Sequence, residues 1–166
     1  MLSGTENVLG FLALLAYVAT LLPSNLKIVF PALKMSWPVK KLLRHRRSIG
    51  IWTFNLSMAH AAFVIGLHNM DVFERSFYYK SASGLMIMGI FALLTITSNN
   101  WSIKKLRRNW KRLHGLTYLA AALLPWHIAA KMEGQWTLLT GIAIPLTALA
   151  VALLCCRKYL EMTPKT

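Results

Sequence analysis

The sequence predicts an all-α integral membrane protein, built as a bundle of about five transmembrane helices. The first observation is composition: hydrophobic residues make up 56% of the 166 residues and charged residues only 14%. The mean hydropathy of +0.48 is far from that of an average soluble domain. The second observation is distribution, because the apolar residues gather in stretches of the length that crosses a bilayer and the cations lie between them.

Five apolar stretches are the expected spans. They are residues 8–22, 48–67, 82–97, 113–130 and 136–156. The first span is expected to end or kink at Pro23 and could resume through Phe30. Segments 27–47 and 101–112 are expected as basic loops, and the polar residues 98–100 could cap the helix that follows them.

The cations predict the orientation of the chain. Sixteen of the 19 Lys and Arg fall in segments 27–47 and 101–112 or after the last span, all on one side of a five-span protein. Four of the five acidic residues fall on the other side. The positive-inside rule then places the N-terminus outside and the C-terminus in the cytoplasm, and it makes the second and fourth spans parallel.

The net charge of +14 would suggest nucleic-acid binding in a soluble protein. Cations confined to short segments between apolar spans are instead typical of membrane orientation and of contact with anionic lipids. We therefore expect membrane lipids, and no nucleic acid, among the partners. Residues 1–166 are expected to form a single transmembrane domain with no soluble domain, because no long polar segment could hold a nucleotide- or flavin-binding fold.

Two histidines lie deep in parallel spans. His60 follows Arg47 by 13 residues, about 20 Å along a helix axis, and His127 lies at a matching depth in the fourth span. An ionisable group at such depth is costly unless it is paired, neutral or bound. Facing imidazoles suit the axial positions of a haem iron. A structural hydrogen bond to a neighbouring helix is the alternative, and on spacing alone the two carry equal weight.

The other three histidines are weaker candidates. His114 lies near the basic end of its helix, 13 residues before His127, and an inner pair with His45 is conceivable. Thirteen residues are about 3.6 turns, however, and do not return to the same helix face. His45 lies among arginines and is expected to be solvated or lipid-facing. His68 ends the second span and is expected to be mainly interfacial, with a ligand or proton-handling role left open.

Two motifs carry a family resemblance. They are Arg46-Arg47-x-x-Gly50-x-Trp52-x-Phe54 ending in His60, and Trp110-x-x-Leu113-His114-x-x-x-Tyr118 with His127 beyond it. These segments are similar to the two histidine helices of the MsrQ family, the haem-binding membrane subunits of the bacterial methionine sulfoxide reductase system. That family lies within the ferric reductase-like transmembrane superfamily.

The resemblance implies a haem b held between His60 and His127, with His114 a ligand or near-ligand of an inner site. Arg46 stands fourteen residues before His60, where the superfamily's inner ligand has no counterpart in this chain. We therefore expect one haem, and Arg46 weighs against a second. The resemblance also implies a multi-pass protein of the bacterial inner membrane or another energy-transducing membrane.

The expected function is that of a b-type haem-binding membrane electron-transfer subunit. It would relay electrons between separate donor and acceptor proteins, as a redox subunit without its own NAD(P)H or flavin domain. Basic residues in 40–47 and 104–112 could dock an acidic flavoprotein donor or hold haem propionates, and lipid contact explains them at least as well. The alternative is a non-catalytic membrane subunit or assembly factor of a larger complex, with haem structural or absent.

Overall fold

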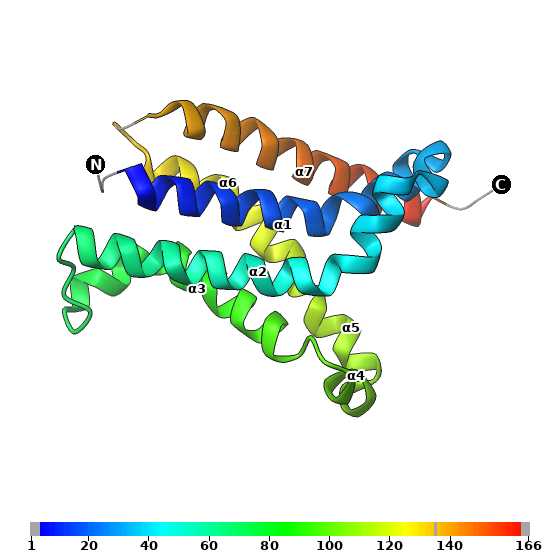
Figure 1. Ribbon diagram of the computed structural model, residues 1–166, viewed down its shortest axis with the longest axis horizontal. Helices are drawn as coiled ribbons and strands as arrows, with labels where there is room; N and C mark the ends of the chain where they lie inside the picture. Colours follow the sequence, from blue (N-terminus) through cyan, green and yellow to red (C-terminus); the bar gives the residue numbers. More distant parts are fainter. Residues whose placement is uncertain (1–3, 135, 164–166) are drawn as a thin grey trace.

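Long helices form where the apolar stretches lie, and they run roughly along one common axis (Figure 1). The computed structural model describes residues 4–134 and 136–163. Within these ranges the regular elements are all helical. They are α1 (Thr5–Val29), the 3₁₀ helix η2 (Pro31–Met35), α2 (Trp37–Leu67), α3 (Arg75–Ile96), α4 (Asn100–Leu106), α5 (Arg108–His114), α6 (Leu116–Lys131) and α7 (Leu138–Met162).

Four of these helices, α1, α2, α3 and α7, are long and apolar enough to cross a membrane. The protein is therefore an all-α, multi-pass membrane protein, as expected. Helix α6 has 16 residues, about 24 Å at the usual helical rise, which is less than the ~30 Å of a hydrocarbon core. The fifth span thus stays a prediction.

The two segments expected as basic loops are largely helical, so that part of the prediction is wrong. Helix α2 begins at Trp37, well before the apolar stretch, and α4 and α5 occupy most of residues 101–112. Lys, Arg and Leu are strong helix formers, and their aliphatic stems can lie along apolar surface. The expected cap is confirmed, because the Asn99 side chain accepts a hydrogen bond from the backbone N–H of Ser102 at 2.7 Å.

Helix α1 does not end at Pro23 but continues to Val29. Proline lacks a backbone N–H, so one carbonyl of the preceding turn has no helical partner there. Membrane helices tolerate this where neighbouring helices cover the site, and Pro23 is almost completely buried. The continuation places two polar residues, Ser24 and Asn25, in the interior at the far end of α1.

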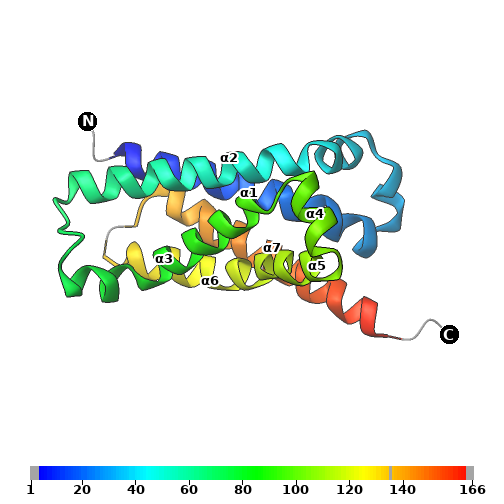
Figure 2. The same cartoon turned by 90° about the horizontal axis from the view of Figure 1, so that it is seen from below.

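Helix α1 lies at the centre, packed along α2 on one side and α7 on another, while α6 packs against α3 and α7 (Figures 1 and 2). The core contains Tyr17, whose ring centroid lies 4.9 Å from that of Phe91 and whose hydroxyl donates to the Thr117 carbonyl. Ala120 and Ala121 are buried and let α6 approach its neighbours closely.

Large apolar side chains cover the outside of the bundle. They include Leu12, Trp52, Phe63, Leu93, Leu119, Ile142 and Leu149. Such extensive exposed apolar surface is typical of a protein whose solvent is lipid.

The two ends of the bundle differ in charge. One end, called the basic end below, gathers η2, the start of α2, helices α4 and α5, and the end of α7 (Figure 1, right). The opposite end holds the start of α1, the turn around 68–74 and residues 132–134, which follow α6. Helices α2 and α6 both run away from the basic end and are parallel, as expected. Lys165, counted among the basic residues of the tail, lies outside the described residues.

We expect a topology reporter fused after Thr166 to read cytoplasmic, because the positive-inside rule places the basic end there. The same reporter inserted beside Asp71, in the turn at the opposite end, should read external. Alkaline phosphatase and fluorescent-protein fusions measure the two states. The reverse pattern would contradict the orientation while leaving the parallel arrangement of α2 and α6 intact.

Candidate functional site

The imidazole of His60, on α2, hydrogen-bonds to the backbone of α1. Its Nδ1 lies 2.7 Å from the backbone carbonyl oxygen of Glu6. A carbonyl can only accept, so a neutral His60 donates its Nδ1 proton and leaves Nε2 with a free lone pair. Gly10, one turn after Glu6, makes the close approach feasible, since a Cβ there would lie 3.1 Å from the imidazole Cε1 and Nδ1.

His127, on α6, is held in a similar way by α3. Its Nδ1 lies 2.9 Å from the hydroxyl oxygen of Ser83. The adjacent Gly84 faces the same ring, and a Cβ at this position would lie 3.0 Å from the His127 Cε1. A hydroxyl can donate or accept, so Ser83 is compatible with the tautomer that carries the proton on Nδ1.

The two imidazoles therefore share one arrangement. Each engages its Nδ1 with a polar atom of a neighbouring helix and packs its ring against a glycine of that helix. Neither Nε2 has a hydrogen-bond partner within residues 4–134 and 136–163. A histidine that ligates a metal through Nε2 almost always donates its other ring N–H to a carbonyl, carboxylate or similar acceptor. Both side chains thus share one feature of metal-bound histidines, an engaged Nδ1 beside a free Nε2.

His60 and His127 line one common cavity of about 460 Å³, between α1, α2, α3, α6 and α7. This volume lies in the range of about 300–1,000 Å³ that is usual for cofactor and ligand sites. Its walls are mainly apolar, with Phe11, Leu14, Val64, Met88, Phe91 and Ile128 among them. A largely apolar cavity with two converging imidazoles can bind a hydrophobic group that carries a metal.

His68 also lines this cavity, although it was expected to be mainly interfacial. It caps the C-terminus of α2, its side chain is 53% exposed, and its Nε2 lies 3.2 Å from the Glu6 carboxylate. Glu6 thus contacts two histidines, His60 through its backbone and His68 through its side chain. His45 is exposed on α2, near the basic end.

His114 lies outside the cavity that His60 and His127 line. Its Nε2 is 3.2 Å from the Thr97 hydroxyl, and its ring stacks on Trp110 with a centroid distance of 4.0 Å. The structure therefore brings His60 and His127 together and separates His114 from them.

The sequence did not reveal the groups that hold the imidazoles. Glu6 acts through its backbone, which no sequence pattern encodes. Gly10, Gly84 and Ser83 lie on helices without a candidate ligand of their own. The one signal in the sequence was that these three are small residues on predicted spans, and small residues are common where membrane helices approach closely.

These features define a class: a multi-pass membrane protein with a histidine pair at a cavity inside its helix bundle. The family described as ferric reductase like transmembrane component matches residues 9–125. The chain belongs to this family. The matched region contains His60 and ends two residues before His127.

Individual relatives have similar sequences. The chain is 31% identical over 125 residues to the protein-methionine-sulfoxide reductase heme-binding subunit MsrQ of Brucella ovis, and equally to those of Brucella canis and Brucella suis. Each match covers 70% of this chain and 52% of the relative. The chain thus spans about half the length of the relatives that it matches.

The contact between Gly84 and His127 predicts a difference between two glycines of α3. Gly84→Ala should lower the free energy of unfolding, since overpacking typically costs about 1–3 kcal/mol. Gly89→Ala is the matched control: a Cβ there meets nothing within 4 Å, and Ala favours a helix by about 1 kcal/mol over Gly. Thermal unfolding in detergent measures both, and equal melting temperatures would contradict the close packing.

Proposed function

We propose that the chain is a haem-binding membrane electron-transfer subunit in which His60 and His127 are the two axial ligands of one b-type haem. The observation that carries the proposal is the pair of imidazoles at one cavity, each with its Nδ1 engaged and its Nε2 unpaired. The relatives from Brucella are described as heme-binding subunits, which supports the same cofactor here.

The donor set fits a haem better than a free metal ion. Within the described residues there is no group of three or more His, Cys, Asp and Glu side chains that could hold an ion. Two histidines would give a metal ion fewer than the three or four protein ligands that are usual in proteins. A porphyrin brings its own four equatorial nitrogens and needs only the axial positions from the protein.

Haem, when bound, supplies a one-electron redox couple. The residues of the chain fix its surroundings. His60 and His127 would occupy both axial positions, which leaves no open position for oxygen or substrate and favours electron transfer. Gly10 and Gly84 allow the rings to lie against their neighbouring helices, and the Glu6 carbonyl fixes the tautomer of His60. The mainly apolar walls lower the local dielectric around the imidazoles.

We also propose that electrons pass between separate donor and acceptor proteins. The relatives' name describes a subunit of a reductase, which supports partners in the membrane or at its surface. The exposed cations of the basic end offer a docking surface for an acidic donor. Lipid contact remains the competing role for these cations.

The residues near the basic end support one haem per chain. The imidazole of His114 hydrogen-bonds Thr97 and stacks on Trp110. On α2, Arg46 stands at the position where the superfamily has its inner ligand, and a guanidinium group cannot ligate a metal. We therefore propose that His114 has a structural role.

We expect His60→Ala and His127→Ala each to abolish the low-spin haem spectrum and most of the bound haem, because each leaves one axial position empty. The double variant should lose little more than either single variant, since both act on one iron. Oxidised and reduced visible spectra, with haem quantified per chain, are the measurement.

His45→Ala is the control and should retain the wild-type haem content, and His114→Ala should retain it as well. A protein that purifies without haem, in fixed ratio with a larger complex, would instead favour the non-catalytic subunit. Loss of haem in His68→Ala with retention in His60→Ala would contradict the proposed pair.

The hydrogen bond between Ser83 and His127 predicts a second effect. Ser83→Ala should weaken haem binding by about 10–100-fold, the usual effect of removing a group that orients a metal-bound histidine. It should also raise the reduction potential, because an imidazole that has lost its Nδ1–H acceptor is less basic and stabilises ferric haem less. Ser98→Ala is the matched control: Ser98 lies just after the end of α3, and its hydroxyl bonds only the Leu94 carbonyl among the described residues. Equal haem affinity in both variants would contradict the positioning role of Ser83.

A further inference from the structure

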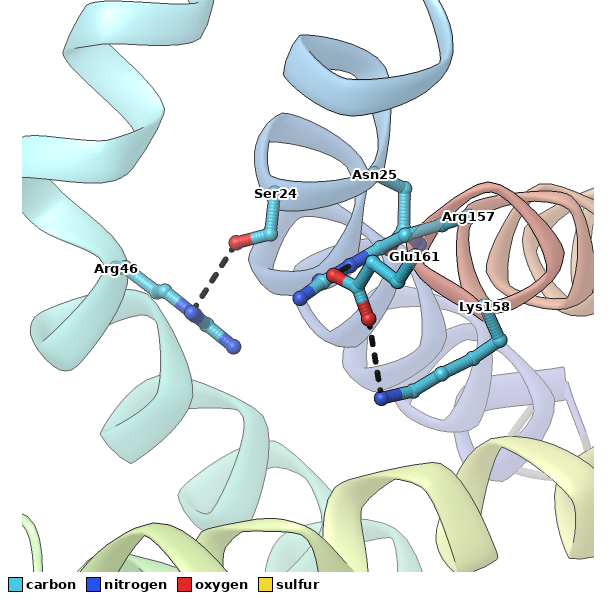
Figure 3. Close-up of polar contacts among 6 residues, drawn as sticks. All are labelled: Ser24, Asn25, Arg46, Arg157, Lys158 and Glu161. Atoms are coloured by element: carbon cyan, nitrogen blue, oxygen red, sulfur yellow. Dashed lines mark hydrogen bonds and ion pairs between the residues drawn. The ribbon is translucent and has the colours of Figure 1, made fainter. Parts of the chain in front are cut away.

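A second polar cluster lies at the basic end, where three helices meet around one turn of α1. Arg46 of α2 donates from Nη1 to the Ser24 hydroxyl at 3.2 Å, and Arg157 of α7 donates from Nη1 to Asn25 Oδ1 at 3.4 Å. Figure 3 shows the two arginine side chains reaching this turn of α1 from opposite sides. The cluster consists of Ser24, Asn25, Arg46 and Arg157.

The cluster has more positive than negative charge. Glu161 is the one acid beside it, paired with Arg157 at 2.8 Å and with Lys158 at 3.3 Å. Arg46 has no ion pair within the described part of the chain, and its bond to Ser24 uses one of its five N–H donors. Glu161 therefore pairs with Arg157 and Lys158, and Arg46 has no counter-charge among the described residues.

Asn25 provides an independent sign of a missing acceptor. The residue is only 1% exposed, and its Oδ1 accepts the bond from Arg157. Its amide nitrogen, Nδ2, is buried without a hydrogen-bond partner among residues 4–134 and 136–163. Buried side-chain donors nearly always have a partner in the protein, a water or a bound group. An unused amide donor beside two guanidinium groups therefore favours an acceptor oxygen at this position.

The cluster is distinct from the histidine cavity. None of its four residues lines that cavity. Arg46 precedes His60 by fourteen residues, about 21 Å along the axis of α2. The cluster therefore lies at a different level of the bundle from the proposed haem ligands.

We propose that this cluster binds the phosphate group of an anionic membrane lipid. Guanidinium groups bind phosphate oxygens with paired, charge-assisted hydrogen bonds, and Asn25 Nδ2 adds a neutral donor. The exposed aromatic residues Trp37 and Tyr159 belong to the same end of the bundle, as expected at the headgroup level. Arg46 is exposed on the bundle surface, where lipid headgroups greatly outnumber soluble phosphates. Basic pockets between membrane helices are known headgroup sites.

The test uses the purified full chain in detergent, titrated with phosphatidylglycerol and followed by native mass spectrometry. Arg46→Gln should weaken binding about tenfold, the effect of losing one charge-assisted contact. Asn25→Asp should weaken it similarly, because a carboxylate replaces the amide donor at nearly constant shape. Arg47→Gln is the matched control: this neighbouring exposed arginine bonds Asn100 on another helix and should retain wild-type affinity.

Two results would overturn the proposal. Equal loss of lipid in Arg46→Gln and Arg47→Gln would mean that binding follows overall charge and not this cluster. Displacement of phosphatidylglycerol by inorganic phosphate would identify a soluble phosphate as the ligand. Phosphatidylcholine with the same acyl chains should bind more weakly, since its headgroup carries a compensating cation. Far-UV circular dichroism and haem content report folding separately, so a failure here leaves the proposed haem site untouched.

Discussion

The contact of each imidazole with a glycine-bearing helix is the constraint on which the rest of the bundle depends. His60 requires α1 to approach α2 at Gly10, and His127 requires α3 to approach α6 at Gly84. These two approaches fix the distance between neighbouring helices at one level of the bundle. The cavity then lies between the two pairs, with residues of α7 forming part of its wall. Displacing either helix would change the position of a histidine and the size of the cavity together.

The two ends of the bundle differ in charge and in the polar groups that they hold. The histidine cavity lies toward the end with the acidic residues, where Glu6 contacts both His60 and His68. The basic end holds the clustered cations, and among them Arg46 and Arg157 meet at α1. Because lipid supplies no hydrogen bonds in its interior, both sets of polar groups depend on partners in the bundle or on bound groups. The same helices thus position two sites of different chemistry.

Much of the fold follows from apolar stretches and charge distribution, since both respond to the bilayer directly. These patterns indicated the long helices and the parallel course of α2 and α6, and hence the shared level of His60 and His127. They failed in the basic segments, because a run of Lys and Arg is compatible with either loop or helix and tertiary contacts decide between them. Helix α2 begins at Trp37, whereas the apolar stretch that predicted it begins at residue 48.

The candidate site was accessible from sequence only in part. Histidine is rare within membrane spans, so His60 and His127 stood out, whereas Ser83, Gly10 and Gly84 are common residues in such helices. Which glycine faces an imidazole depends on the rotation of each helix about its axis. Neither composition nor spacing determines that rotation. His114 shows the same limit, since its contact with Thr97 requires a fold that brings the end of α3 beside α5, whereas Trp110 lies four residues before it on α5 itself.

The two hydrogen bonds to the imidazoles differ in how evolution can alter them. The partner of His127 is a side chain, so a single codon change at Ser83 can remove or replace it. The partner of His60 is a backbone carbonyl, which every amino acid at position 6 would supply as long as α1 keeps its place. Point mutations can therefore change the hydrogen bond of His127 directly. The hydrogen bond of His60 changes only if the packing of α1 against α2 changes. Relatives can diverge freely at position 6 and still hold the first histidine in the same tautomer.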